Sequence, residues 1–256
     1  MMRWAALLAI WPIMVSAQDV GPTPRADIFV LGEVHDNPAH HATQAAIVAE
    51  VTPTALIFEM LDAAQAAAAM AVDRTDVDAL AAAFDWAKSG WPDFDLYAPI
   101  FAAAPDAQIV GAAVGRDALL AAMTDGAAGQ TDAIVPDLTQ AQRDTLAQEQ
   151  ADAHCGALPE EMLPGMVEAQ RLRDAAFGAA AVAAFEAHGG PVVLITGTGH
   201  ARTDVGAPAT IRAMRPDLTV WSLGQVEGDV PADAPFDRVV TAPAPDRADP
   251  CAVFAD

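Results

Sequence analysis

Six short runs of apolar, often β-branched residues recur along the chain and predict the strands of one sheet. Runs that are apolar on both sides are typical of strands covered on both faces, and alternation with helices is typical of crossover connections. We therefore predict an α/β fold with a mixed, mostly parallel sheet flanked by helices. The runs cover about Asp27–Leu31, Thr54–Glu59, Ala107–Ala112, Val192–Thr196, Leu218–Leu223 and Phe236–Thr241.

Helix signals lie between these runs. Asn37 can cap a helix with Pro38 at its first position, which favours a helix from Pro38 to about Glu50. Further helices are expected over about 138–153, 160–188 and 204–214. The stretch from about 116 to 190 has no convincing strand, so we predict that it is a helical subdomain inserted in the second half. The tail from Pro243 is rich in Pro and Asp and is predicted to be irregular.

The first seventeen residues have the pattern of a secretory signal peptide. Arg3 gives a positive start, an apolar core runs from Trp4 to Val15, and Val15-Ser16-Ala17 is a small-residue cleavage site. The core is shorter than the ~20 residues of a spanning helix. No cysteine lies near the cleavage point, so a lipid anchor is not indicated. We predict an exported, soluble, periplasmic protein with a signal peptide at 1–17 and a single domain at 18–256.

The net charge limits the classes of ligand that we expect, and the two cysteines leave several roles open. A net charge of −22 repels phosphate backbones and anionic headgroups, which argues against nucleic-acid binding. An anionic ligand would need a local arginine cluster. Cys155 and Cys251 are the only cysteines. A disulfide that ties the tail to the middle of the chain, two free thiols, and a site role for Cys155 all remain open.

Two distant strand ends carry the same chemistry. Glu33 and His35 follow the first strand, His200 follows the fourth, and Glu59 ends the second. Because the carboxyl ends of parallel strands form one rim, we expect all four side chains in a common crevice. Neighbouring carboxylates coexist if one is protonated or if a cation or histidine neutralises them. The alternative is that Glu59 merely caps a helix or pairs with an arginine.

Other polar residues have two interpretations each. His40 and His41 lie in the first turn of the predicted helix, where we expect at least one to be solvent-exposed. Gln170 and Arg173 share a ridge of the long helix with Phe177, as either a salt-bridged surface or the polar wall of a pocket. The chain has no Walker-type loop, no complete dinucleotide fingerprint and no Gly-x-Ser-x-Gly elbow, which makes a serine hydrolase improbable.

Six sequence blocks follow one another in order between about residue 27 and residue 225. They are the run Leu31 to His41, Phe58-Glu59, Ser89 to Pro92 with Tyr97, His154-Cys155-Gly156, Ala169-Gln170 with Arg173-Asp174, and Gly197 to Arg202. With these blocks the chain resembles the ChaN-like haem-binding proteins, which belong to a superfamily that also contains the Tiki and TraB proteins. Gly-Glu-x-His alone would be a weak signal, whereas six ordered blocks are specific.

The resemblance implies a ChaN-like α/β domain in haem or iron uptake, with contact to membrane uptake machinery. It also implies haem held by a tyrosine at a homodimer interface, and Tyr97 is the only tyrosine. A phenolate is a known haem ligand. The alternative is that Tyr97 packs in a loop with Trp91. The candidate cofactor-binding residues are Tyr97, Trp91, Lys88, His154, Gln170, Arg173 and Arg202, with Lys88, Arg173 and Arg202 opposite the propionates and Trp86, Trp91 and Phe94 against the haem faces.

A second hypothesis is an enzyme. Distant members of the same superfamily act as metal-dependent peptidases or esterase-like hydrolases. Glu33, His35, Glu59 and His200 would then be the catalytic residues and the ligands of a divalent metal, with His35 or Glu33 as general base on a water molecule. Because no nucleophile motif is present, we favour haem binding over catalysis, and a scaffold role is the third possibility.

Overall fold

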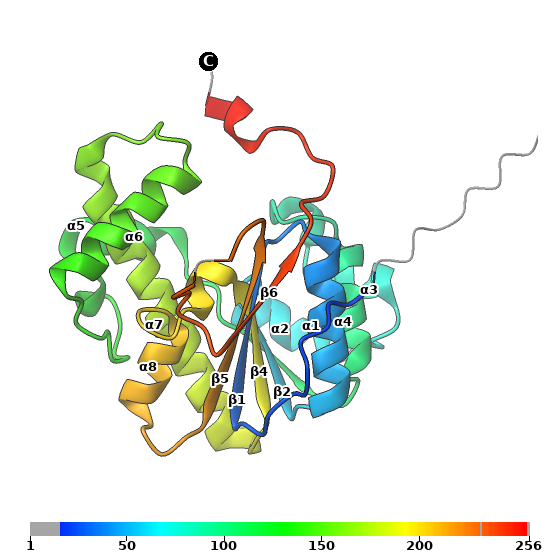
Figure 1. Cartoon of the computed structure of the whole chain (residues 1–256). Coiled ribbons are helices and arrows are strands. Elements are labelled where there is room, and N and C mark those ends of the chain that lie inside the picture. Colours follow the sequence, from blue (N-terminus) through cyan, green and yellow to red (C-terminus); the bar gives the residue numbers. More distant parts are fainter. Residues whose placement is uncertain (1–15, 231, 255–256) are drawn as a thin grey trace, which may run out of the picture.

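The computed structural model of the chain describes residues 16–230 and 232–254 (Figure 1). The signal peptide predicted at 1–17 lies almost entirely outside the described residues. Among the described residues, no helix is long and apolar enough to cross a membrane.

One six-stranded sheet forms the centre of the molecule. The strand order is β3-β2-β4-β1-β5-β6, and every pairing between the described strands is parallel. The predicted α/β fold is confirmed, although the sheet is parallel throughout the described strands rather than mixed. The strands differ from the predicted ranges mainly at their ends. They are β1 (Ile28–Glu33), β2 (Ala55–Phe58), β3 (Gln108–Gly111), β4 (Val192–Gly197), β5 (Val220–Glu227) and β6 (Arg238–Ala242).

Helices cover both faces of the sheet (Figure 1). Helices α1 to α4 lie on one side, α7 and α8 cover the other, and α5 and α6 pack outside α7. The α-helices are α1 (Pro38–Val51), α2 (Ala63–Ala69), α3 (Val77–Ala83), α4 (Ala98–Ala103), α5 (Arg116–Asp125), α6 (Gln140–Ala153), α7 (Leu163–His188) and α8 (Ala207–Met214). Short 3-10 helices are η1 (Trp86–Lys88), η2 (Phe94–Leu96), η3 (Ala127–Gly129), η4 (Glu160–Met162), η5 (Thr198–Ala201) and η6 (Pro250–Phe254).

The buried strands show why both faces are covered. In β1 all six residues are buried. Phe29 and Leu31 belong to the apolar cluster under α1 and α4, whereas Ile28 and Val30 belong to the cluster under α7 and α8. Side chains of a strand alternate between faces, so a continuous apolar run needs a helical layer on each side.

The segment predicted as a helical insertion contains one helix more than expected and is partly built into the core. Helix α5 was not predicted. Helix α7 packs against β2 and β4, and its Phe177 and Ala181 join the core cluster of the sheet. The segment therefore supplies a main covering helix of the sheet, while α5 and α6 extend away from it.

The strand order places a topological switch point between β1 and β4. From β1 the chain passes through α1 to β2, which lies on the far side of β4. From β4 it passes through α8 to β5, on the far side of β1. Ligands of open α/β sheets bind at such a point, beyond the carboxyl ends of the strands. At Gly32 a Cβ atom would lie 2.8 Å from the Cα of Thr198, so only glycine allows these two strand ends to approach.

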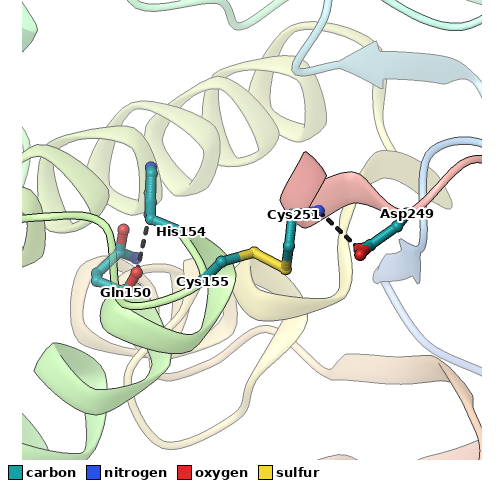
Figure 2. Close-up of a disulfide and its surroundings, with 5 residues drawn as sticks. All are labelled: Gln150, His154, Cys155, Asp249 and Cys251. Carbon is teal, nitrogen blue, oxygen red and sulfur yellow. Dashed lines mark hydrogen bonds between the residues drawn. A yellow bond between two sulfur atoms is a disulfide. The ribbon is translucent and has the colours of Figure 1, made fainter. Parts of the chain in front are cut away.

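The C-terminal tail is tied to the middle of the chain by a disulfide between Cys155 and Cys251 (Figure 2). Their Cα atoms are 5.6 Å apart. Arg247 in the tail also pairs with Asp36 and Glu227. Of the alternatives left open by the sequence, the disulfide is the one that the structure contains. The tail is irregular as predicted as far as η6.

Candidate functional site

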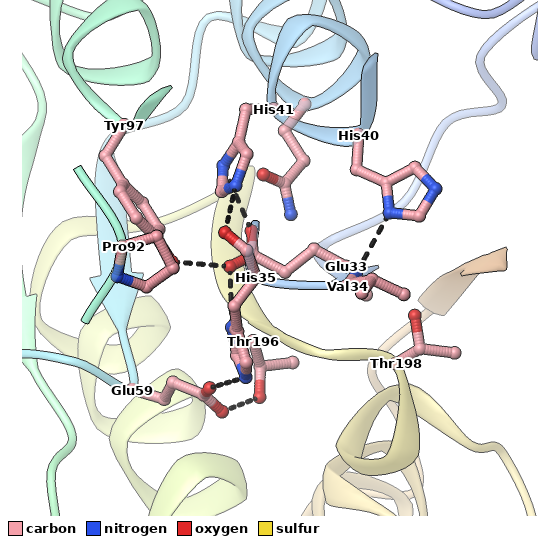
Figure 3. Close-up of polar contacts among 12 residues, drawn as sticks. Glu33, Val34, His35, His40, His41, Glu59, Pro92, Tyr97, Thr196 and Thr198 are labelled. Carbon is pink, nitrogen blue, oxygen red and sulfur yellow. Dashed lines mark hydrogen bonds and ion pairs between the residues drawn. The ribbon is translucent and has the colours of Figure 1, made fainter. Parts of the chain in front are cut away.

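Glu33 is a buried carboxylate at the end of β1, surrounded by donors (Figure 3). It accepts hydrogen bonds from Nδ1 of His35 at 2.9 Å and from the hydroxyl of Tyr97 at 3.0 Å. Nδ1 of His41 lies 3.4 Å from its other oxygen. Burial would raise the pKa of Glu33, but the charge of His41 and the hydrogen bond from His35 outweigh burial and keep this pKa below its usual value.

His35 connects the two carboxylates that the sequence placed near each other. Its Nε2 lies 3.2 Å from Oε1 of Glu59, and Oε2 of Glu59 accepts from Thr196 at the end of β4. Burial would lower the pKa of His35, but the hydrogen bond to Glu33 and the charge of Glu59 outweigh it and raise this pKa, which favours the protonated ring. The ends of β1, β2 and β4 are thereby linked through one imidazole ring.

The expectation that His40 or His41 is solvent-exposed is wrong. Both are fully buried, because their rings bind the backbone that leaves β1. Nδ1 of His40 accepts from the backbone N–H of Val34 at 2.9 Å, and Nε2 of His41 donates to the carbonyl of His35 at 2.7 Å. Burial lowers the pKa of His40, which favours the neutral ring that this acceptor role requires. These two histidines shape the loop that presents His35.

His200, in η5 just after β4, has a different partner. Its Nδ1 lies 2.7 Å from Oδ1 of Asp174, a buried residue of α7. Burial raises the pKa of Asp174 to about 6, against the opposing effect of His200. Burial lowers the pKa of His200, but the charge and hydrogen bond of Asp174 outweigh it, and the net pKa is raised. The sequence analysis did not propose Asp174 as a site residue. Its position, four residues after Gln170 on α7, was the available signal.

These groups surround one pocket of about 400 Å³, which we call the switch-point pocket. His35, Glu59 and His200 all line this pocket, so three of the four expected side chains converge there, whereas Glu33 is buried and bound to His35. Cavities of about 460 and 540 Å³ lie elsewhere among the described residues, but neither contains a histidine. The residues that line the pocket are His35, Glu59, Met60, Trp91, Ala113, Val114, Arg173, Phe177 and His200.

Aromatic rings and one cation complete the switch-point pocket. The ring of Trp91 packs edge-on against His35 with centroids 4.8 Å apart, and Phe177 packs in the same way against His200 at 5.1 Å. Arg173 has no ion-pair partner in the part of the chain that the structure describes. Of the two interpretations of this residue, the wall of a pocket is the one that the structure supports.

The structure places Tyr97 inside the core. Its side chain is fully buried, its ring packs against His41 with centroids 4.4 Å apart, and its hydroxyl donates to Glu33. Burial and the charge of Glu33 hold the pKa of Tyr97 far above its usual value. In this arrangement the phenol oxygen cannot reach an external iron atom and cannot ionise readily, contrary to what the expected role requires.

Several other predicted residues lie outside the pocket. Lys88 has a side chain that is 79% exposed and pairs with Asp85, while Arg202 pairs with Glu149 and Asp204. Trp86 and Phe94 belong to the apolar core rather than to a ligand surface. Gln170 and His154, the other two candidates, both contact Gln150 of α6. The side-chain oxygen of Gln170 accepts from the side chain of Gln150, and Nδ1 of His154 lies 2.8 Å from the backbone carbonyl of Gln150.

The described residues contain no cluster of side chains suited to a divalent metal. Among the described residues, no group of three or more His, Cys, Asp or Glu side chains is arranged to hold a metal ion. The reason is visible in the network: Glu33, His35 and Glu59 bind one another, and His200 binds Asp174.

Comparison with known proteins assigns the family. The family described as haem-binding uptake, Tiki superfamily, ChaN matches residues 22–211, which is most of the chain. The chain belongs to this ChaN family. The resemblance drawn from the six sequence blocks is thereby confirmed. A comparison with curated proteins finds no match.

One solved structure shares the fold of this chain. The structure described as cofacial haem binding to ChaN of Campylobacter jejuni matches with a TM-score of 0.68 and 20% identity, over 84% of this chain and 86% of that one. At this identity the likeness shows the fold alone. More distant are the type III effector HopBA1 (TM-score 0.43, 14% identity, 85% and 88% covered) and a mutant of erythromycin esterase EreC in its open conformation (0.43, 13%, 86% and 76%).

Proposed function

We propose that this ChaN-family protein binds haem in the switch-point pocket and takes part in haem or iron uptake, with haem as its cargo. The observation that carries the proposal is the pocket itself, which combines aromatic walls with an unpaired guanidinium at the switch point. Its volume of about 400 Å³ lies within the range of roughly 300–1,000 Å³ that is usual for ligand sites. Family membership and the haem-binding description of the Campylobacter jejuni ChaN structure support it.

The residues present fit the chemistry of haem. Its apolar faces need apolar walls, which Met60, Trp91 and Phe177 provide. Its propionates need a cation in a strongly acidic protein, and Arg173 is available in the pocket for a paired hydrogen bond. Its iron needs an axial ligand, and imidazole nitrogen is among the established ones.

We further propose that the protein is exported to the periplasm, acts as a homodimer and contacts uptake machinery in the membrane. The signal-peptide pattern of residues 1–17 supports export. The disulfide between Cys155 and Cys251 supports an oxidising compartment. Size-exclusion chromatography with light scattering, with and without hemin, tests the dimer.

Hemin titration tests the function directly. Purified protein 18–256 should shift and sharpen the absorption spectrum of hemin at a stoichiometric ratio. Arg173→Ala should weaken affinity about tenfold, equivalent to ~1.4 kcal/mol, because a charge-assisted hydrogen bond is lost. The matched control is Arg25→Ala, which removes an exposed arginine at the opposite end of the sheet, away from the pocket. A wild-type protein that leaves the hemin spectrum unchanged contradicts the proposal.

A second candidate function is ester hydrolysis without a metal, and the His200–Asp174 pair favours it. Asp174 orients His200, which takes a proton from water as the water oxygen attacks a carbonyl carbon. Arg173 stabilises the negative oxygen of the tetrahedral intermediate, and the protonated His200 then gives the proton that it took from water to the leaving alcohol. Turnover of p-nitrophenyl esters above buffer, lost in His200→Ala, would support hydrolysis. Absence of turnover by the wild type would exclude it for these esters.

A further inference from the structure

We infer that His200, held by Asp174, is the side chain that binds haem iron in this protein, and that Tyr97 is not. The inference rests on the proposed function, because it names the ligand within the switch-point pocket.

Tyr97 is excluded by its surroundings. It is the only tyrosine in the chain, and it has no exposed surface. Its hydroxyl hydrogen is used by the Glu33 carboxylate at 3.0 Å. A phenolate at this position would face the Glu33 carboxylate in the core, an unfavourable arrangement of like charges. Iron could reach its oxygen only if the packing around Tyr97 opened.

The other histidines near the strand ends offer no nitrogen to the switch-point pocket. His35 lines the pocket, but Glu33 binds one of its nitrogens and Glu59 binds the other. His40 and His41 are buried beneath the loop. His188 is exposed at the end of α7, and neither it nor His154 is among the residues that line the switch-point pocket.

His200 has the opposite arrangement. Only its Nδ1 is engaged, by Asp174, and its Nε2 has no hydrogen-bond partner among the described residues. The side chain is 17% exposed and lines the switch-point pocket, and Nε2 is not among the polar atoms that are buried without a partner. A proton on Nδ1 that is shared with a carboxylate leaves the Nε2 lone pair directed away from Asp174.

The residues around His200 resemble those that usually surround a metal-binding histidine. Histidines that bind metals usually donate their other N–H to a carboxylate or carbonyl, which fixes the tautomer and makes the ligand nitrogen more basic. Asp174 meets this condition from a buried position on α7. Phe177, one helical turn further along α7, packs edge-on against the ring and limits its rotation.

The test compares ferric and ferrous haem complexes of matched variants. The wild-type complex should show an imidazole-type ferric spectrum without a phenolate-to-iron charge-transfer band, and Tyr97→Phe should leave it unchanged. His200→Ala should lose this spectrum and bind hemin at least about tenfold more weakly. Free imidazole added to His200→Ala should restore the spectrum. The matched control is His188→Ala, an exposed histidine outside the pocket.

Asp174→Asn separates positioning from ligation. It should keep the nitrogen ligand but lower the iron–histidine stretching frequency of the ferrous complex in resonance Raman spectra, because the ring nitrogen becomes less basic. A phenolate band that disappears in Tyr97→Phe while His200→Ala retains the wild-type spectrum would overturn the inference alone. A wild type that binds no hemin would overturn the proposed function and this inference with it.

Discussion

The two histidines of the switch-point pocket lie at the ends of neighbouring strands and have opposite bonding. After β1, His35 is held on both nitrogens, by Glu33 and Glu59. After β4, His200 is held on one, by Asp174. In this pocket the number of carboxylate partners separates a structural histidine from one that can meet a ligand. His35 uses both nitrogens to link three strand ends, whereas His200 keeps its Nε2 without a partner among the described residues.

The largest expected effect comes from removing the carboxylate behind His35. Glu33→Ala leaves the Tyr97 hydroxyl and the His35 cation without their partner in the core, which should lower the free energy of unfolding by about 3–5 kcal/mol. The melting temperature should then fall by about 10 °C, as followed by circular dichroism. Glu50→Ala, an exposed glutamate on α1, is the control. A fall no larger than that of the control would show that the β1 network is not structural.

Asp174→Asn should cost less stability than Glu33→Ala. The amide keeps the volume and a hydrogen bond to His200, and only the charged part of the bond is lost, about 1–2 kcal/mol. Thermal unfolding of both variants under one buffer condition measures the order. If Asp174→Asn proved more destabilising than Glu33→Ala, the His200–Asp174 pair would be the one that stabilises the fold, and the roles given to the two histidines would be reversed.

One substitution should shift the pH range over which His35 stabilises the protein. Because the pKa of His35 is raised, the stability that it contributes is fully present below its unfolded pKa near 6.5 and is lost as pH rises through the folded pKa. Glu59→Gln removes a charge that raises this pKa, so the loss should occur at lower pH. NMR titration of His35 and melting temperatures between pH 5 and 9 report both quantities. An unchanged titration midpoint would mean that Glu59 does not act on His35.

The smallest effect is expected at Lys88. Its ion pair with Asp85 is exposed, and water screens such pairs. Lys88→Ala should leave both the melting temperature and the hemin affinity unchanged within error. A clear loss of hemin affinity would place a propionate outside the switch-point pocket and would weaken the roles given to Arg173 and His200.

The sequence was sufficient for the fold because each strand is an unbroken apolar run. Runs such as Ile28–Leu31 and Val192–Ile195 are buried on both faces, which only a covered parallel sheet explains. Strand ends were less predictable. Gly32 and Glu33 continue β1 because they pair with Thr196 and Gly197 of β4, which lie far away in the sequence.

The site was predictable only in part, for a physical reason. Position after a strand was enough to bring His35, Glu59 and His200 to one rim. Which polar groups pair with each other depends on the packing of helices against that rim. Asp174 comes from α7, and Tyr97 donates to Glu33 from the turn before α4, so both contacts join segments that are far apart in the sequence. The same packing buried His40 and His41 and paired Arg202 with Glu149 and Asp204.

The disulfide between Cys155 and Cys251 closes a segment of the chain that contains only some of the residues of the switch-point pocket. The cross-linked segment contains α7, β4 and η5, and hence Asp174 and His200, whereas His35 and Glu59 precede it in the chain. When the protein unfolds with the disulfide intact, Asp174 and His200 stay inside a closed loop of the chain. His35 and Glu59 lie outside that loop. A pull on the C-terminus would load the end of α6 first and would leave β4 to β6 shielded from tension.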